Sequence, residues 1–124
     1  MSQVIHTNNA PEAIGPYSQA ISVGNLVFTS GQIAINPATG AVEADTIEAQ
    51  TEQVCQNLVE VLKAAGTSMD KAVKTTCFLR NMEDFAAFNQ IYGNYFTSKP
   101  ARSCVAVREL PKNVLVEVEV IAEI

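Results

Sequence analysis

The first 31 residues contain short apolar runs that are broken by turn-forming residues. Two β-prone runs, residues 18–23 and 26–31, are separated by a Gly-Asn dipeptide at 24–25. Because both positions of such a gap tolerate positive φ, the pattern predicts a tight β-hairpin. A short run at Val4–His6 predicts an edge strand, and the Pro- and Asn-containing stretch Thr7–Tyr17 predicts an ordered loop.

After a predicted turn at residues 36–40, the apolar positions take the period of a helix. Asp45 is the predicted N-cap, and Glu48 follows three residues later, as in a capping box. Gly66 has the position of a glycine that ends a helix. The pattern therefore predicts a helix of about 20 residues with one buried face. Its apolar stripe consists of Ile47, Val54, Leu58, Val61, Leu62 and Ala65.

The second half of the chain predicts a strand, a helix and two further strands. Residues 73–79 alternate as in a strand, and Asn81 is the predicted N-cap of the second helix. The strands after Pro100 are predicted at residues 101–107 and 114–124. The inward-facing residues of the helix are predicted to be Phe85, Phe88, Ile91, Tyr92 and Tyr95. This order predicts an α+β fold with two helices on one sheet face, so the opposite face must meet water or another subunit.

Composition restricts the class of protein. The 124 residues suffice for one compact domain, so we expect residues 1–124 to form a single domain. No apolar run approaches the roughly 18–20 residues of a membrane span, and no signal peptide is recognisable. Three cysteines without a C-x-x-C pair favour reduced thiols and a cytoplasmic location. A net charge of −5 with scattered basic residues argues against nucleic-acid binding.

The last two predicted strands carry the strongest candidates for chemistry. One side of the final strand is expected to carry Leu115, Glu117, Glu119 and Ile121, and the strand before it Arg102, Cys104 and Ala106. If these strands pair around the turn near residues 110–111, Arg102 lies opposite Glu117 or Glu119. A guanidinium on a rigid strand binds a carboxylate bidentately, and a neighbouring glutamate can activate water. The alternative is a cross-strand ion pair worth less than ~1 kcal/mol.

The remaining candidates are open to structural interpretations as well. His6 is the only histidine, which disfavours a catalytic triad, and the chain lacks the ligand spacing of a zinc site. Cys104 is either a nucleophile or, as we favour, inert packing. Ser30 and Gly31 either offer polar groups to a ligand or end a strand at a bulge. Tyr17 either covers a pocket or caps the core.

Four separated motifs give the chain a family resemblance. They are Ala-Ile-Gly-Pro-Tyr-Ser-Gln at 13–19, Thr-Ser-Gly-Gln-Ile at 29–33, Pro-Ala-Arg-Ser-Cys-Val at 100–105 and Leu-Pro-Lys at 110–112. In this order they resemble the RidA/YjgF family of reactive-intermediate deaminases, over nearly the whole chain. The resemblance implies a chorismate-mutase-like α+β domain, a homotrimer with a central barrel-like core, and active sites in clefts between subunits.

The resemblance also implies a reaction and residue roles. The implied reaction hydrolyses 2-imino acids or their enamine tautomers, such as 2-iminobutanoate and 2-iminopropanoate, to 2-oxo acids and ammonia. Neither a metal nor an organic cofactor is implied. Arg102 matches the arginine that binds the substrate carboxylate, and Glu117 the glutamate that positions the attacking water. The other matching positions are the substrate-binding Tyr17, Ser30, Gly31 and Cys104, and Asn89 near the interface.

The sequence departs from the family pattern at two places. Only residues 97–99 lie between Phe96 and Pro100, where many relatives have a longer segment, and this affects the expected pocket mouth. Ala34 replaces a proline that is frequent in the family.

The main alternative function is a small-carboxylate-binding regulatory module that acts on a protein partner. An endoribonuclease or translation inhibitor is a further alternative, which the acidic charge disfavours.

Overall fold

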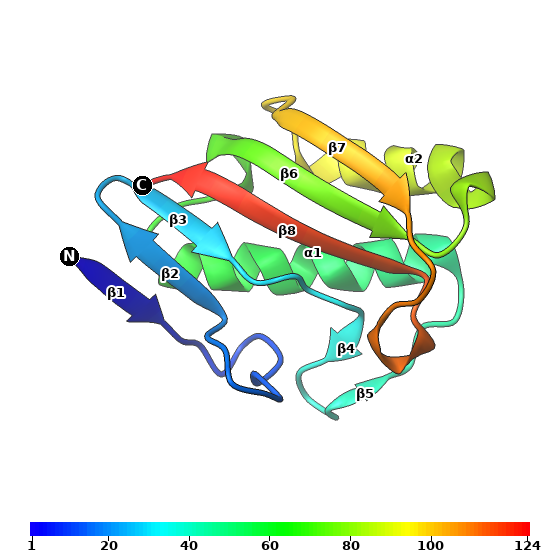
Figure 1. Cartoon of the computed structure of the whole chain (residues 1–124), viewed down its shortest axis with the longest axis horizontal. Coiled ribbons are helices and arrows are strands. Elements are labelled where there is room, and N and C mark those ends of the chain that lie inside the picture. The colour runs from blue at the N-terminus through cyan, green and yellow to red at the C-terminus, as the bar shows by residue number, and fades with distance from the viewer.

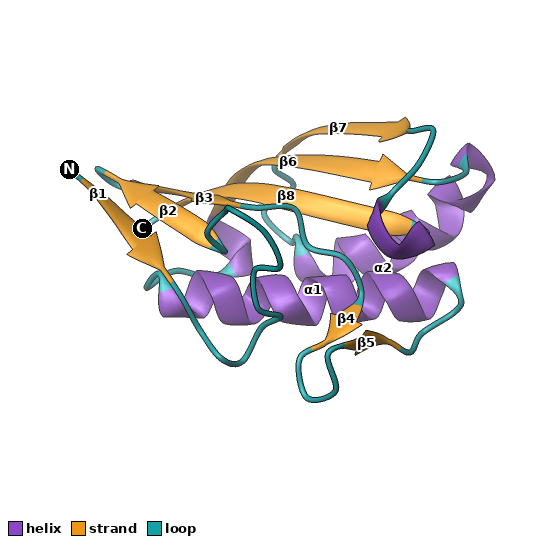
Figure 2. Ribbon diagram, turned by 60° about the horizontal axis from the view of Figure 1, so that its bottom comes forward, coloured by secondary structure: helices purple, strands orange, loops and turns teal.

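The computed structural model describes residues 1–124 and has a six-stranded sheet with both helices on one face (Figures 1 and 2). The sheet order is β1-β2-β3-β8-β6-β7. The strands are β1 (Ser2–Ile5), β2 (Ala20–Val23), β3 (Leu26–Thr29), β6 (Ala72–Leu79), β7 (Ala101–Ala106) and β8 (Val116–Glu123). The helices are α1 (Ile47–Ala64) and α2 (Phe85–Tyr95), and a small separate hairpin joins β4 (Ile35–Asn36) to β5 (Ala41–Val42).

The sheet is mixed, because one of its pairs is parallel. β6 and β7 run parallel, whereas every other neighbouring pair is antiparallel. Parallel neighbours need a long crossover connection, and α2 supplies it between β6 and β7. The predicted α+β class with two helices on one sheet face is therefore confirmed.

The core lies between the sheet and α1. Val116, Val118 and Val120 of β8 are fully buried, together with Val54 and Leu58 of α1. Burial alternates along β8, as the valine pattern predicted, because successive side chains of a strand point to opposite faces. No helix is long and apolar enough to cross a membrane.

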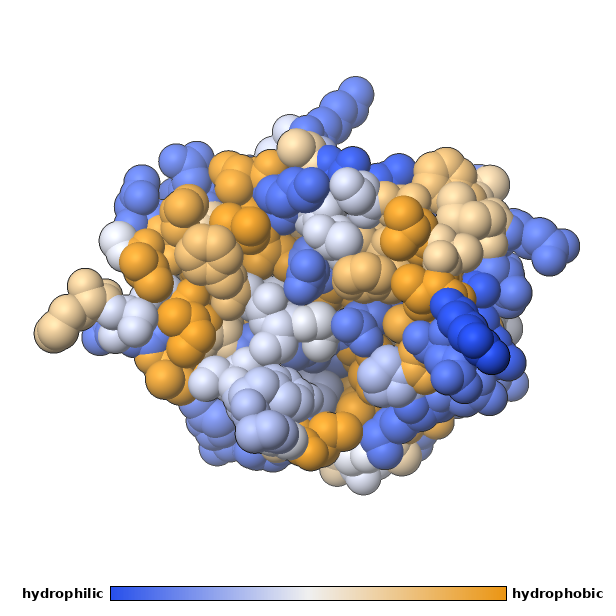
Figure 3. Space-filling view, viewed as in Figure 1, coloured by the Kyte–Doolittle hydropathy of each residue, from blue (hydrophilic) through white to orange (hydrophobic).

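The other face of the sheet is not covered by helices and points toward the viewer in Figure 3. Apolar atoms gather on it over β1, β2 and β3. Val4, Phe28 and Val105 belong to this face by strand register, and 67%, 41% and 47% of their respective surfaces are exposed. Exposed apolar side chains gathered on one sheet face are typical of a surface that contacts another molecule.

Several local predictions are confirmed, and two helix starts are corrected. Val23 pairs with Leu26 around the predicted hairpin, in which Gly24 has φ 59°. The N-cap of α1 is Thr46 rather than Asp45, because the Thr46 hydroxyl accepts the Ala49 N–H at 3.1 Å. Both residues are good N-caps, so only the backbone conformation distinguishes them.

The second helix begins later than predicted. Asn81 precedes a 3₁₀ turn at Met82–Asp84, and α2 starts at Phe85 with Asp84 at its N-cap. Of the predicted inward-facing residues, Phe88 and Tyr92 are buried, whereas the others are half-buried. The aromatic rings of this helix also lie beside β7, which places them next to the candidate site.

Candidate functional site

The two strands that carry Arg102 and Glu117 are not neighbours. β6 lies between β7 and β8, with Arg102 beside Thr75 and Glu117 beside Phe78. The expectation that Arg102 lies opposite Glu117 or Glu119 in a β7–β8 pair is therefore wrong. The physical reason is the α2 crossover, which returns the chain to the outer edge of β6, so that β7 pairs there and leaves the inner edge to β8.

Within one chain the two side chains also lie on opposite faces of the sheet. Arg102 shares the helix-covered face with Thr75, which is fully buried, whereas Glu117 belongs to the open face. Their Cα atoms are roughly 14 Å apart, because they are two strands apart across the sheet and three residues apart along the strands. A single copy therefore does not bring the predicted carboxylate anchor and the predicted water-positioning carboxylate to one substrate.

Arg102 is held by α2. Its Nη1 donates a hydrogen bond to the Asn89 Oδ1 at 2.7 Å. The guanidinium carbon lies 4.9 Å from the centre of the Tyr92 ring and 5.4 Å from that of Phe85. Stacking and one hydrogen bond occupy part of the guanidinium and keep it extended at the edge strand, while its other N–H groups remain available to an anion.

Cys104 lies on the same face as Arg102 and beside Cys77 of β6. Burial raises the pKa of the Cys104 thiol, although the nearby Arg102 lowers it in part. The thiol is therefore neutral near pH 7, which favours a packing role over a nucleophilic one. All three cysteines are free.

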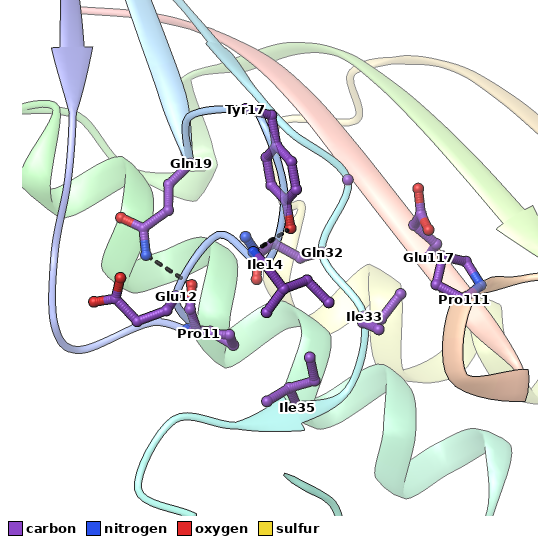
Figure 4. Close-up of a pocket in the computed structure, with 11 residues that line it drawn as sticks. Pro11, Glu12, Ile14, Tyr17, Gln19, Gln32, Ile33, Ile35, Pro111 and Glu117 are labelled. Atoms are coloured by element: carbon purple, nitrogen blue, oxygen red, sulfur yellow. Dashed lines mark hydrogen bonds between the residues drawn. The ribbon is translucent and has the colours of Figure 1, made fainter. Parts of the chain in front are cut away.

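Glu117 lies in a different place, a cavity of about 180 Å³ between the N-terminal part of β8 and the loop before β2 (Figure 4). The side chains of Glu117 and Tyr17 line it, together with the backbone of Gly31. Its other lining residues are Pro11, Glu12, Ile14, Gln19, Gln32, Ile33, Ile35 and Pro111. Isoleucine and proline side chains thus form an apolar wall beside a single half-buried carboxylate.

Gly31 makes close approach to Glu117 possible. A Cβ atom at this position would lie 2.8 Å from the Glu117 Cδ and closer still to its Oε2. The next residue fixes the distance, because Gln32 N–H donates to Val118 O at 2.8 Å and Val118 N–H donates to Gln32 O at 3.1 Å. Gly31 has no positive φ, and a side chain at this position would instead displace the Glu117 carboxylate.

Ser30 and Tyr17 border the same carboxylate. Both line a shallow hollow with Glu117 and Glu119, next to the cavity. The Ser30 hydroxyl donates to Ser18 O at 2.6 Å, so its proton joins the residue after β3 to the loop before β2. The Tyr17 hydroxyl accepts the Ile14 N–H at 3.3 Å, and almost half of the Tyr17 surface is exposed at the cavity mouth.

The electrostatics of this cavity are entirely acidic. Burial raises the pKa of Glu117, and the neighbouring charge of Glu119 raises it further. Glu12 is the other ionisable carboxylate in the lining, and no Arg or Lys contributes to it. A carboxylate with a raised pKa is a stronger base, but an anionic substrate finds no cation here within one chain.

The structure therefore divides the predicted residues into two half-sites. Tyr17, Ser30, Gly31 and Glu117 come together at the cavity, and Asn89, Arg102 and Cys104 come together beside α2. The sequence reasoning missed the cavity wall formed by Ile14, Ile33 and Pro111 and the buried Gln19. All four residues had a signal, because each lies within one of the motifs that carry the family resemblance.

Comparisons with known proteins agree with the family resemblance. The family model described as Endoribonuclease L-PSP matches residues 7–124. The 2-iminobutanoate/2-iminopropanoate deaminase of Escherichia coli K12 is 48% identical over 126 residues, with 98% of each chain covered. A Lactococcus lactis relative with the provisional name of a regulator, AldR, is 53% identical over 123 residues, again with 98% of each chain covered.

Solved structures have the same fold. The crystal structure of Escherichia coli TdcF with bound serine matches with a TM-score of 0.93 and 41% identity, covering 98% of both chains. The sheet with two helices on one face and the glutamate cavity thus define a small α+β domain with a family of close structural relatives. The chain belongs to the RidA/YjgF family, whose family model is the Endoribonuclease L-PSP model.

Proposed function

We propose that this protein hydrolyses short 2-imino acids, such as 2-iminobutanoate and 2-iminopropanoate, to 2-oxo acids and ammonia. The observation that carries the proposal is the half-buried Glu117 carboxylate, held against Gly31 in a small, partly apolar cavity. The name of the Escherichia coli relative, at 48% identity over nearly the whole chain, supports the same reaction.

The proposed chemistry needs one base and one positioned water. The carbon of a protonated imine is electrophilic, so a water molecule beside Glu117 attacks it while the carboxylate accepts a proton from the water. The resulting tetrahedral aminoalcohol receives that proton on nitrogen. As its C–N bond breaks, its hydroxyl group returns a proton to the Glu117 carboxylate, which leaves the 2-oxo acid. The released ammonia takes this proton away as ammonium and restores the carboxylate. The enamine tautomer enters the same route after it takes up a proton at its β-carbon. The raised pKa of Glu117 suits these proton transfers.

The substrate carboxylate requires a cation that the cavity lacks. Arg102 has free N–H groups, but it lies on the other face of its own sheet. We therefore propose that the active site forms between two copies of the chain, with Arg102 of one copy and Glu117 of the next. The net charge of −5 makes such a local anchor necessary, because it repels anions at long range.

A homotrimer accommodates this arrangement. Arg102 and Glu117 lie on different surfaces of the molecule, so a contact that joins them is heterologous and must close into a ring. The apolar part of the open sheet face, which includes Val4, Phe28 and Val105, offers an area that such a ring would bury. The proposed trimer thus covers the sheet face and completes the sites together.

A binding role without turnover is the second candidate. The Lactococcus lactis relative with a regulator's name favours it, and so does the crystal structure of TdcF, which is described with bound serine. In this case the two half-sites would hold a small carboxylate and change contacts with a protein partner. RNA cleavage, which the description of the family model names, is disfavoured by the net charge and by the acidic cavity.

The deciding experiment generates the imines in place. An amino-acid oxidase forms 2-iminobutanoate or 2-iminopropanoate, and semicarbazide traps the imine that remains. Wild type should lower the semicarbazone signal, whereas Arg102→Ala and Glu117→Gln should not. Turnover by neither wild type nor variants, together with binding of 2-oxobutanoate, would favour the regulatory role instead.

Mixing the two variants tests where the site lies. Co-refolded Arg102→Ala and Glu117→Gln chains form mixed trimers, each with one interface that carries both wild-type residues. Random assembly of equal amounts then restores about one quarter of the wild-type activity. Each variant refolded alone is the matched control. Persistent inactivity of the mixture, with mixed trimers demonstrated by native mass spectrometry, would contradict a site between copies.

A further inference from the structure

The loop Thr7–Tyr17 forms one wall of the Glu117 cavity, and only Ala10 and Pro11 of this loop are buried. It contributes Pro11, Glu12, Ile14 and Tyr17 to the cavity lining. The exposed fraction is 66% for Ile14 and 48% for Tyr17, so these walls do not derive their position from burial in the core. Besides the core contact of Ala10, a polar interaction must therefore hold this part of the loop against the cavity.

Gln19, the residue directly before β2, supplies that interaction. Its side chain is 3% exposed, and its Oε1 accepts the Thr7 N–H at 2.7 Å. Its Nε2 donates to Thr7 O at 3.0 Å and to Pro11 O at 2.8 Å, with a longer bond of 3.4 Å to Ala10 O. One carboxamide thus joins both ends of the Thr7–Pro11 segment, and Figure 4 shows its bond to Pro11 at the cavity edge.

No comparable set of side-chain hydrogen bonds reaches the loop from elsewhere in the chain. The only other side-chain bond from outside the loop is between His6 and Glu12, at 3.2 Å. Both of those side chains are more than half exposed, so this pair contributes little. The remaining side-chain bonds are internal, such as the one between Ile14 N–H and the Tyr17 hydroxyl. Gln19 therefore makes the only buried side-chain hydrogen bonds to the loop, in addition to the packing of Ala10 in the core.

We infer that Gln19 is a positioning residue for the proposed imine hydrolysis, because its carboxamide holds the Thr7–Tyr17 loop and so sets the size of the substrate side chain that fits beside Glu117. This inference rests on the proposed function. Without the carboxamide, the backbone groups of Thr7, Ala10 and Pro11 turn to water and the loop moves away from the cavity. Ile14 and Tyr17 move with it, and the wall that limits substrate size is lost.

The test compares Gln19→Met with a matched control, Gln50→Met. Methionine has nearly the length and volume of glutamine but makes no comparable hydrogen bonds. Gln50 is also buried, at 4% exposure, and its side chain also joins two backbone segments, donating to Ala44 O at 3.0 Å and accepting Leu115 N–H at 2.8 Å. Unlike Gln19, it does not line the cavity.

The readout is the ratio of kcat/KM for two imines, formed from 2-aminobutanoate and from the bulkier leucine. We expect Gln19→Met to lower kcat/KM for the small imine by up to about 100-fold and to bring the ratio close to one. Gln50→Met should keep the wild-type ratio. A merely structural role reduces the fraction of active protein, which changes both rates equally and leaves the ratio unaltered.

Hydrogen exchange gives a second readout that needs no substrate. The Thr7 and Ile14 amides should exchange faster in Gln19→Met than in Gln50→Met, at equal melting temperature. If Gln19→Met does not fold, Gln19→Asn, which keeps the amide but shortens the side chain, provides the same comparison. An active wild type with an unchanged ratio in the Gln19 variants overturns this inference alone. An inactive wild type overturns the proposed function, and the positioning role of Gln19 with it.

Discussion

Replacing Gly31 by alanine should lower activity strongly while leaving the fold intact. The added Cβ would lie 2.8 Å from the Glu117 Cδ, whereas ordinary contacts begin near 3.4 Å. The carboxylate carbon must therefore retreat by about 0.6 Å, and the nearer oxygen by about 1 Å. Gln32 binds the backbone of Val118, so the side chain of Glu117 moves rather than the backbone of residue 31.

The expected magnitude follows from this displacement. A shift of about 1 Å in a catalytic group costs up to about 100-fold in rate, or about 2.7 kcal/mol in transition-state stabilisation. The stability should change little, because Gly31 has no positive φ and a glycine-to-alanine change gains ~0.4–1 kcal/mol by restricting the unfolded chain. That gain offsets the cost of moving one flexible carboxylate. We expect the free energy of unfolding to stay within about 1 kcal/mol of wild type.

The assay is a double-mutant cycle with the semicarbazide-trapping reaction. Gly31→Ala should lower kcat/KM strongly in the wild-type background and hardly at all beside Glu117→Ala, where the carboxylate is already absent. Urea unfolding of the same variants provides the stability control. Wild-type activity in Gly31→Ala would refute the reasoning, and so would an equal further loss in the Glu117→Ala background.

Three further predictions concern pH, the core and a helix start. Glu117 acts as a base with a pKa raised above the usual 4.5, so kcat/KM should begin to fall with decreasing pH before pH 4.5 is reached. Glu119→Gln should shift this fall in kcat/KM to lower pH, but the pKa of Glu117 should stay raised because burial is its larger cause. Asn57→Ala leaves two backbone carbonyls beside α1 unpaired in the core, and urea unfolding should show a loss of about 2–4 kcal/mol. Thr46→Ala should cost about 1 kcal/mol, whereas Asp45→Ala should cost at most a few tenths in the same assay; the opposite order would contradict the observed N-cap.

Much of the fold could be predicted because it depends on neighbours in the sequence. The hairpin at residues 24–25 needs only a glycine that adopts positive φ between two β-prone runs. The extent of α1 follows from its apolar stripe, and Gly66, with φ 86°, follows its end as predicted. The alternating valines of β8 likewise identify the buried face of that strand.

The half-sites could be predicted only in part, since strand pairing is not a local property. The alternation in residues 101–106 and in β8 is the same whether these strands are neighbours or are separated by β6. Tertiary packing decides between these arrangements, because the α2 crossover makes β7 the parallel partner of β6. This pairing places Arg102 and Glu117 on opposite faces of the sheet.

The sequence alone therefore determined the elements, the buried faces and the residue types available for chemistry. Each of these depends on side-chain periodicity, on turn residues or on a recognisable motif. Only the tertiary structure decided which of the candidates meet, since contacts such as Gly31 with Glu117, or Gln19 with the Thr7–Pro11 segment, join strands and loops by long-range packing. Side-chain direction is a local property of a strand, whereas the neighbour that a side chain meets depends on the order of strands in the whole sheet.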